Sequence, residues 1–393
     1  MHIVHVCAHF TTKLEYQELA LAREEIRTGH RVSVVTSEWN FNFPNYEATY
    51  KRILGDRFIG KGHFVEEGIN IYRLKLITWP NVFLRLKNCV RVLKKISPDL
   101  IICHGFEYGF LGVQSARVNV PVIIDSHWMP VYFKGFEFKR TYKDLIREKV
   151  SRMKAKYLLR RNTCFFGVTE ESVDYITSFG IPADRVKLIP LGANLDHFRF
   201  NEDIRESIRG EFHIDKSAVV LCFSGKVEAY KGVHLIIESM RILNRQDLYL
   251  FIIGNGSEKY KNSLSDLVEN SGLKNRVFFI DFANKQELNN YFCASDIYIT
   301  PLDVTISHLE AMAARLPIIV EDLKGIRHRL SNDNGFTVKA NDVNDIAAKI
   351  GSLATDPLLR KKMGANGEQL VKNHFNWEAL NKRILNLTES NVR

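Results

Sequence analysis

The chain has 393 residues, of which 45% are hydrophobic and 25% charged, so it is a folded protein long enough for two domains and is not intrinsically disordered. Its formal net charge of +10 favours anionic partners, such as nucleotide phosphates, lipid headgroups or nucleic acid. The apolar runs, such as 248–253, are far shorter than the roughly 18 residues of a membrane-spanning helix, which excludes a transmembrane protein.

Cysteine usage and the opening residues bear on the cellular compartment. The six cysteines are scattered and form no Cys-x-x-Cys pair, which argues against both a disulfide framework and a cysteine metal site. Residues 1–8 have the pattern of a short apolar strand, without the basic leader or the cleavage site of a signal peptide. We therefore expect a reduced, cytoplasmic protein.

Strands and helices alternate along the first half of the chain. Residues 3–8 predict a strand that leads into a helical pattern over 15–28, and Gly29-His30 ends this helix before a second strand at 31–36. Further strand-like runs follow at 99–104, 121–125, 164–169 and 186–190. This alternation predicts a parallel sheet with helices on both faces.

A second alternating series begins after the polar stretch 201–215, which we interpret as an interdomain connection. Its strand-like runs lie at 219–223, 249–253, 277–281, 296–301 and 317–321. Two such series predict two Rossmann-like domains with a cleft between them, and with ligand sites beyond the carboxyl ends of the strands. We assign three segments: a first domain over 1–195, a second over 196–370, and a C-terminal helix over 371–393 that packs toward the first domain.

The strand that ends at 300 runs into a helix that carries Glu310. Backbone N–H groups at a helix start suit a diphosphate. About one turn inside the helix, Glu310 can accept hydrogen bonds from two neighbouring hydroxyls, as a ribose offers. The alternative is a glutamate that only complements the helix dipole.

Two lysines follow the strand at 219–223. Lys226 and Lys231 can both direct ammonium groups at phosphates and stabilise the charge on a departing diphosphate. The alternative is a pair of exposed lysines that flank a loop. After the next strand comes Gly254-Asn255-Gly256, but Lys259 stands where a dinucleotide fingerprint needs its third glycine, so an oxidoreductase is disfavoured.

The first half offers a histidine and a polar loop. His127 follows the strand at 121–125, where its imidazole can donate to a sugar hydroxyl or to a leaving oxygen, although a lone histidine is more often structural. The loop after the first strand is a candidate surface for an acceptor or for phosphates, and its residues are Thr11, Thr12, Lys13 and Tyr16.

Taken together, these segments resemble the group-1 (family 4) type of retaining GT-B glycosyltransferases. The resemblance runs nearly end to end and is carried by Glu15-Tyr16-Gln17-Glu18, Gly29-His30-Arg31-Val32, Ile189-Pro190-Leu191-Gly192-Ala193-Asn194, Lys226 with Lys231-Gly232, Gly254-Asn255-Gly256, Leu309-Glu310-Ala311-Met312-Ala313 and Phe375-Asn376-Trp377-Glu378. It implies an α/β GT-B fold whose first domain binds the acceptor and whose second binds the nucleotide sugar.

The resemblance also implies an activity and site residues. The activity is transfer of a hexose from a nucleotide sugar, with a UDP-sugar as the default, to a glycan or lipid-linked acceptor in envelope or surface polysaccharide biosynthesis. Lys226 and Lys231 would hold the diphosphate, Glu310 the ribose and His127 the transferred sugar. The other donor-binding positions are Gly225, Gly254, Asp281, Phe282, Ile306, Ser307 and Leu309. No metal and no cofactor beyond the nucleotide sugar is implied.

Three positions depart from the family pattern. Lys226 stands where arginine is usual, which keeps the charge but loses the bidentate fork. Thr11-Thr12 replaces a glycine pair in the first loop. The usual glutamate eight positions before Glu310 would fall on Leu302, so we assign Asp303, one place further on, as its substitute in contact with the donor sugar.

These features leave alternatives of different classes. No carboxylate pair of a double-displacement enzyme is evident, so we expect a same-face reaction in which the leaving diphosphate takes the acceptor proton. The runner-up is a catalytically silent GT-B subunit that binds a nucleotide or stabilises a partner, favoured by the displaced acid at Asp303. A nucleic-acid-binding module is third, because no recognition motif accompanies the basic residues.

The positive charge is concentrated at 139–161, where ten basic residues face two acidic ones. Apolar residues at helical spacing make this segment a basic amphipathic helix. Several basic residues suffice for reversible attachment to an anionic leaflet, at about 1 kcal/mol each. Our hypothesis is peripheral attachment to the inner face of the membrane, and the alternative is a solvated face of a helix packed on its domain.

Overall fold

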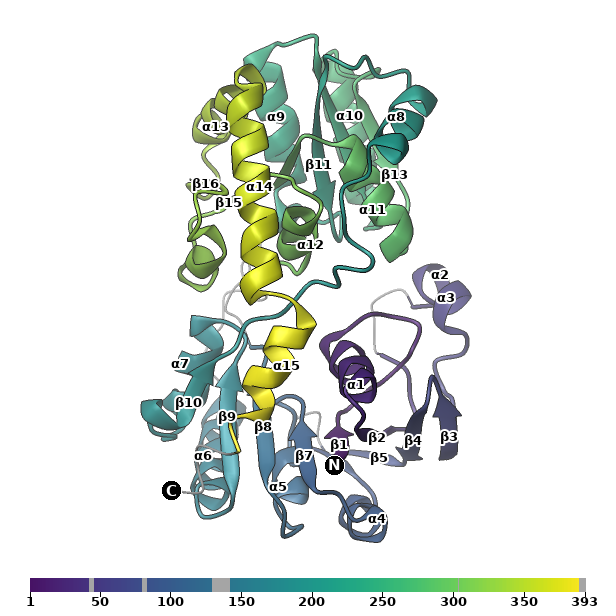
Figure 1. The fold of residues 1–393 in the computed structure, drawn as a ribbon, viewed down its shortest axis with the longest axis vertical. Coiled ribbons are helices and arrows are strands. Elements are labelled where there is room, and N and C mark those ends of the chain that lie inside the picture. The colour runs from purple at the N-terminus through teal and green to yellow at the C-terminus, as the bar shows by residue number, and fades with distance from the viewer. Residues whose placement is uncertain (42–45, 80–82, 129–141, 303, 389–393) are drawn as a thin grey trace. The chain divides into compact units, whose positions relative to one another are not determined.

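The structure, a computed structural model, describes residues 1–41, 46–79, 83–128, 142–302 and 304–388. It divides the chain into two compact units (Figure 1). Unit 1 comprises Met1–Leu191 and Trp377–Arg393, and unit 2 comprises Gly192–Asn376. Each unit is built on its own α/β sheet, as expected for a GT-B fold.

Unit 1 has an eight-stranded sheet in the order β10-β9-β8-β7-β1-β2-β4-β3, with β3 antiparallel to β4 and the other neighbours parallel. The strands are β1 (His2–Val6), β2 (Arg31–Ser37), β3 (Gly62–Glu66), β4 (Ile69–Leu74), β7 (Leu100–Cys103), β8 (Val122–Ser126), β9 (Thr163–Gly167) and β10 (Val186–Leu188). A separate hairpin pairs β5 (Leu76–Trp79) with β6 (Phe83–Leu86). The strand order reverses between β1 and β7, which makes their carboxyl ends the natural ligand position.

Helices cover both faces of this sheet. On one face α4 (Cys89–Ile96), α5 (Leu111–Ser115) and α6 (Tyr142–Leu158) share a buried cluster with the strands. On the other face α1 (Gln17–Arg27) lies beside the C-terminal helix α15 (Trp377–Leu385), whose Leu380 and Ile384 are buried with Ile3 and Leu21 (Figure 1). The remaining helices are α2 (Tyr46–Thr49), α3 (Lys51–Leu54), α7 (Glu170–Ser178) and the 3-10 turn η2 (Ala183–Arg185).

Unit 2 has a six-stranded parallel sheet in the order β13-β12-β11-β14-β15-β16. The strands are β11 (Val219–Ser224), β12 (Leu248–Ile253), β13 (Val277–Ile280), β14 (Ile297–Thr300), β15 (Ile318–Glu321) and β16 (Gly335–Val338). The four central strands, β11, β12, β14 and β15, are buried along most of their length, as parallel strands with covered faces must be, whereas the edge strands β13 and β16 are mostly partly buried. The order reverses between β11 and β14, so the loops after these two strands meet at the switch point.

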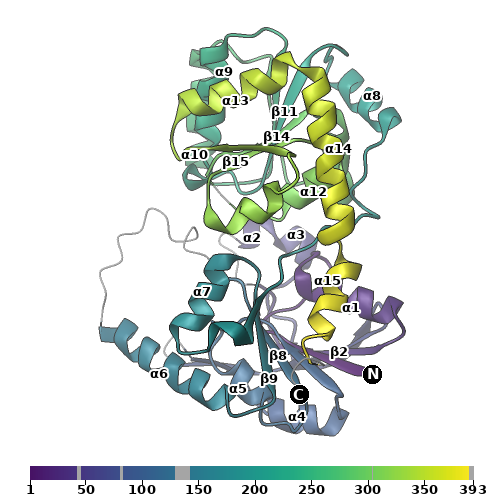
Figure 2. The same ribbon diagram turned by 60° about the vertical axis from the view of Figure 1, so that its left-hand side comes forward.

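The helices of unit 2 pack in two groups. One face of the sheet buries a cluster with α9 (Val233–Leu243), α10 (Glu258–Asn270) and α13 (Val343–Thr355), and α13 packs against α9 (Figure 2). Helix α8 (Glu202–Glu211) packs against α11 (Lys285–Ala294), and α12 (Ser307–Ala313) against α14 (Pro357–His374). Short 3-10 segments complete the unit: η3 (Ala229–Lys231) and η4 (Lys324–Leu330).

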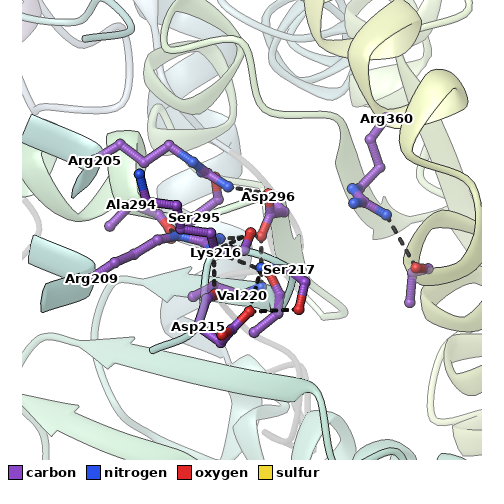
Figure 3. A network of polar contacts seen from close by, with 12 residues as sticks. Arg205, Arg209, Asp215, Lys216, Ser217, Val220, Ala294, Ser295, Asp296 and Arg360 are labelled. Atoms are coloured by element: carbon purple, nitrogen blue, oxygen red, sulfur yellow. Dashed lines mark hydrogen bonds and ion pairs between the residues drawn. The ribbon is translucent and has the colours of Figure 1, made fainter. Parts of the chain in front are cut away.

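The expectation that 201–215 is an interdomain connection is wrong. Asn201 caps α8 by accepting a hydrogen bond from the Ile204 backbone, and α8 belongs to unit 2. Arg205 and Arg209 of α8 bind the two carboxylate oxygens of Asp296 at 2.7 and 2.6 Å (Figure 3). The charges that suggested a solvated linker thus belong to an ion-pair network in which the arginine at 209 is buried.

The basic segment forms α6, although 139–141 lie outside the described residues. Its buried face contains Ser151, Lys154, Ala155 and Leu158. Three apolar side chains instead point to solvent, Leu145, Ile146 and Met153, with 53, 52 and 65% exposed. Over the described parts of the chain, each helix is too short or too polar to cross a bilayer.

Candidate functional site

Glycines hold the loops after β11 and β12 together. The Gly225 N–H donates to the Ile253 carbonyl at 3.0 Å, and the Val227 N–H donates to Asn255 at 3.0 Å. A Cβ at Gly254, where φ is +133°, would lie 2.0 Å from the Gly225 carbonyl oxygen. Close approach of two loops at adjacent strand ends therefore requires glycine at 254.

The two predicted lysines stand on the β11 loop. Lys226 is exposed, whereas Lys231, at the end of η3, is partly buried and lies with its ammonium 5.3 Å from the Tyr230 ring centroid. Burial and the positive charge of Lys226 lower the pKa of Lys231 to about 7. The charge of Lys226 thus disfavours protonation of Lys231, and a bound anion would offset this effect.

Gly232, the residue after Lys231, lies against the loop that follows β14. A Cβ at Gly232 would meet the Leu302 side chain at 2.9 Å, so the two loops at the switch point are in contact. Asp303, assigned to the donor sugar, lies outside the described residues.

His308 and Arg329 support the β14 loop from below. Nε2 of buried His308 bonds to Thr300 Oγ1 at 2.6 Å, and Arg329 Nη1 donates to the Thr305 carbonyl at 2.6 Å. Burial, together with the charges of Arg329 and Lys231, lowers the pKa of His308 well below its usual value, so this ring is neutral. No motif singled out Arg329, because η4 approaches α12 only through the tertiary structure.

Glu310 is buried, with 3% of the residue exposed. Its Oε1 is paired with Lys285 at the start of α11, and its Oε2 has no hydrogen-bond partner among the described residues. A carboxylate oxygen has two lone pairs, so Oε2 can still accept from a ligand hydroxyl. The sequence around Lys285 signals a helix start, through the capping box of Asn284 and Glu287, but nothing in it points to Glu310.

The other donor-binding positions follow β13 and β14. Asp281 is exposed, with its carboxylate 4.0 Å from Lys261, and Phe282 is partly buried. Ile306 precedes α12, where the Ser307 N–H donates to Thr305 Oγ1 at 3.3 Å. Leu309 is buried in α12. All predicted donor-binding residues that the structure describes therefore follow the carboxyl ends of strands β11 to β14 of one sheet.

In unit 1, His127 follows β8. Its backbone N–H donates to Glu107 Oε1 at 3.2 Å, and its Nε2 lies 3.5 Å from Asp125 Oδ2. Burial would lower the pKa of His127, but Asp125, with weaker help from Glu107 and Glu18, raises it to about 9. The side chain is 30% exposed, so a protonated imidazole is available at the end of the strand.

The loop after β1 holds the predicted acceptor-side residues. Thr12 donates to Glu66 Oε2 at 2.6 Å, and Lys13 Nζ donates to the Leu54 carbonyl at 3.4 Å. Thr11 is buried and accepts from the Lys13 backbone N–H at 3.2 Å. Tyr16 is 40% exposed. Of these four, Lys13 and Tyr16 are therefore the exposed residues.

His104, Asp125 and His127 offer ligand atoms within 4.8 Å of one another, as a metal site would. Both ring nitrogens of His104 are already engaged, however. Nδ1 lies 2.7 Å from Asp125, and Nε2 lies 2.8 Å from His5. The group is therefore arranged as a hydrogen-bonded chain, and a metal would have to break it.

Comparison with known proteins covers both units. A family model described as a glycosyl transferase 4-like domain matches residues 17–192, and one described as glycosyl transferases group 1 matches 204–370. An uncharacterised glycosyltransferase of Methanocaldococcus jannaschii is 24% identical over 93% of this chain and 91% of its own length.

A GDP-mannose-dependent monoacylated alpha-(1-6)-phosphatidylinositol monomannoside mannosyltransferase of Corynebacterium glutamicum is 30% identical, but the match covers 46% of this chain and 49% of that protein. Among solved structures, Anabaena HepE in complex with UDP aligns with a TM-score of 0.73 and 16% identity, over 99% of this chain and 100% of that one. At this identity the likeness shows the fold.

Proposed function

Because the chain belongs to the group 1 glycosyltransferases, we propose that it moves a sugar, with retention of anomeric configuration, from a nucleotide-sugar donor to a glycan or lipid-linked acceptor. The setting we propose is envelope or surface polysaccharide biosynthesis. One observation carries the donor assignment: Lys226 and Lys231 both lie on the loop after β11, which contacts the loop after β14 at the switch point of a parallel sheet. A diphosphate neutralises such a pair.

Unit 2 would hold the donor. The two lysines bind the diphosphate, and Glu310, whose buried Oε2 has no hydrogen-bond partner among the described residues, accepts from the ribose. Lys285 holds the other carboxylate oxygen and so fixes the orientation of Glu310. Helix α12 has seven residues, so we assign diphosphate binding to side-chain charge rather than to the helix terminus.

The nucleotide base is a choice between two candidates. UDP is the first, and it is the nucleotide bound by Anabaena HepE. GDP is the second, because the Corynebacterium glutamicum relative is named as GDP-mannose-dependent. Asp281 and Phe282, which follow β13, are the residues we assign to the base.

The reaction exchanges one bond at the anomeric carbon for another. The bond to the diphosphate breaks, the acceptor oxygen bonds to the same face, and the acceptor proton passes to a diphosphate oxygen. Lys226 and Lys231 stabilise the charge that develops on the leaving group. His127 donates to a hydroxyl of the transferred sugar. Support for the same-face route comes from the carboxylates near His127: Asp125 is fully buried, and both oxygens of Glu107 are hydrogen-bonded.

A lipid-linked acceptor would be reached from a membrane surface. Exposed Leu145, Ile146 and Met153 share α6 with exposed basic residues: Arg147, Lys149, Arg152 and Lys156. We therefore propose reversible attachment through α6 to the inner face of an anionic membrane. Sedimentation with vesicles tests this. Equal binding to neutral and anionic vesicles would remove the electrostatic argument, and substitution of the three apolar side chains by serine should weaken binding.

The donor is identified by thermal unfolding with UDP-, GDP- and ADP-sugars, because a ligand at a hundred times its Kd adds about 2.7 kcal/mol of stability. The stabilising donor is then used for transfer, with the anomeric configuration of the product read by NMR. An inverted product contradicts the same-face route. Binding without transfer to any glycan or lipid-linked acceptor favours the alternative of a catalytically silent subunit.

A further inference from the structure

Buried polar side chains of unit 1 form a continuous chain that ends beside His127. Glu25 Oε2 lies 2.7 Å from His5 Nε2, His5 Nδ1 lies 2.8 Å from His104 Nε2, and His104 Nδ1 lies 2.7 Å from Asp125 Oδ2. The four residues of the chain are at most 2% exposed. They come from α1, β1, the end of β7 and β8, so the chain crosses three adjacent strands beneath one helix.

The geometry of the two rings suits a direct bond between them. The imidazoles of His5 and His104 are inclined by only 2°, with centroids 5.2 Å apart. Each ring therefore points one nitrogen at the other ring and its second nitrogen at a carboxylate. The charged state of one ring then depends on that of the other, because a nitrogen can donate only when it carries a proton.

Counting protons links the charge of the two rings to that of the two carboxylates. Three hydrogen bonds join the four groups, and each bond contains one proton. With Glu25 and Asp125 both ionised, the carboxylates supply none, so the two imidazoles supply all three and one ring is a cation; a protonated Glu25 would supply one proton and leave both rings neutral. In the arrangement with both carboxylates ionised, Glu25 accepts from Nε2 of His5. Burial would lower the pKa of His104, but Asp125 raises it, so the cation resides on His104.

Asp125 consequently interacts with two histidines, His104 and His127. His104 is 2.7 Å away and His127 is 3.5 Å away, both measured to Oδ2. Burial would raise the pKa of Asp125, but these two rings hold it well below its usual range. A cation on His104 repels one on His127, and it offsets part of the attraction that Asp125 exerts.

Other polar groups also face these rings. Glu18 of α1 attracts both His104 and His127, and Glu107 attracts His127. From α1, neutral Gln17 donates to Asp125 at 3.1 Å, and the Gly105 N–H donates to its other oxygen at 2.6 Å. These groups affect the electrostatic potential at His127, but they are not part of the series of hydrogen bonds from Glu25 to Asp125.

We propose that Glu25, acting through His5 and His104, is a positioning residue that sets how firmly Asp125 holds the proton of His127. The inference rests on the proposed role of His127 toward the transferred sugar. A structural role alone explains the chain poorly, because a buried ionic group contributes little net stability compared with apolar side chains of similar size.

The variant Glu25→Gln separates charge from shape. A glutamine amide can donate to Nε2 of His5, which then donates from Nδ1 to His104, which in turn donates from Nδ1 to Asp125. All three hydrogen bonds remain, and neither ring is a cation. Asp125 then acts on His127 without a competing charge. We expect the pKa of His127 to rise by about one unit, as for removal of one nearby charge.

The experiment follows the ring of His127 by NMR in the full-length chain labelled with ¹⁵N-histidine, with His127→Gln to assign the signal. Glu25→Gln should raise the pKa, and Asp125→Asn should lower it by about two units. Glu24→Gln is the matched control, since Glu24 lies next in α1 and pairs with Arg27 instead. In Glu24→Gln, the pKa of His127 should equal its value in the parent protein.

An unchanged or lowered pKa in Glu25→Gln overturns the proposal. If that variant does not fold, the double variant Glu25→Leu/His5→Phe replaces the buried pair by apolar groups and predicts the same rise. Tight Zn²⁺ binding with loss of the His104 N–H signals would also overturn it. Transfer assays, including the pH dependence of kcat, then separate the role of Glu25 from that of His127. If Glu25→Gln shifts the pKa of His127 but His127→Gln leaves transfer unchanged, only the proposed role of His127 is rejected.

Discussion

Lys285 at the start of α11 is paired with Oε1 of Glu310 in α12, 25 residues further along the chain. The carboxylate is 3% exposed and the lysine side chain 29%. Replacing Lys285 by Met leaves a buried carboxylate without its cation. We expect a loss of about 2 kcal/mol of stability and weaker donor binding, measured by urea unfolding and by titration calorimetry.

Lys274→Met is a suitable control for that variant. Lys274 pairs with Glu269 in the same unit, but its side chain is 75% exposed and that of its partner 68%. Such a pair contributes at most about 1 kcal/mol. If both variants lose the same stability, Lys285 has no special relation to Glu310.

The assignment of Glu310 to the ribose predicts non-additive losses. Glu310→Gln should weaken binding of the ribose-containing donor about tenfold or more, because a charged acceptor contributes about 1.5–3 kcal/mol. A 2′-deoxy donor should also bind the parent protein more weakly than the ribose-containing donor does. The two changes together should cost less than their sum, since each removes one side of the same hydrogen bond. Full additivity would place the ribose elsewhere.

The ion pairs of α8 predict a separate effect on stability. Arg209 is 4% exposed at its side chain and binds Asp296, as Arg205 also does. Arg209→Met should cost about 3 kcal/mol in chemical unfolding, since the largely enclosed carboxylate of Asp296, 11% exposed, loses one of its two cations. Arg245→Met, at the more exposed pair with Asp247, should cost less than about 1 kcal/mol. Equal losses would contradict a structural role for α8.

The same region shows what the sequence could and could not predict. Continuous apolar runs such as 219–223 and 249–253 predicted buried parallel strands, and these are confirmed as β11 and β12 with only small shifts at their ends. Residues 201–215 were misread, because a buried arginine that meets a distant aspartate has the same local composition as a solvated linker.

The strands β3 and β4 were not predicted from the sequence, for a related reason. In β3 four of five residues are exposed, and β4 alternates buried and partly buried positions. Neither strand has the continuous apolar run that marked the central ones. Pattern alone therefore recovered the middle of the sheet of unit 1 but not the edge formed by β3 and β4.

For the candidate site, the sequence predicted residues that follow the strands and carry a motif, such as Lys226 and Lys231 on the β11 loop and Glu310 in α12. Two residues that were not identified from the sequence, Lys285 and Arg329, lie outside these motifs. Lys285 reaches Glu310 from a different helix, and Arg329 reaches the Thr305 carbonyl from η4. Their roles depend on tertiary packing, which no local pattern encodes.

Lys231 predicts a pH dependence of donor binding. Its pKa in the free protein is lowered to about 7 from an ordinary value near 10.5 by burial and by Lys226. A diphosphate binds the protonated form, so binding raises this pKa. Affinity is therefore full below about pH 7, and it falls as pH rises above 7, by up to tenfold per unit. Calorimetry in buffers of different ionisation enthalpy should detect proton uptake on binding.

Two lysine variants test the cause of that dependence. Lys226→Met removes the repelling charge, raises the pKa of Lys231 and should move the decline in affinity to higher pH. Lys259→Met removes the same charge from an exposed position of unit 2 and should leave the profile where it was. Lys231→Met should flatten the profile and slow transfer about a hundredfold or more. A profile that persists without Lys231 would assign the titration to another group and remove the main support for diphosphate binding at the end of β11.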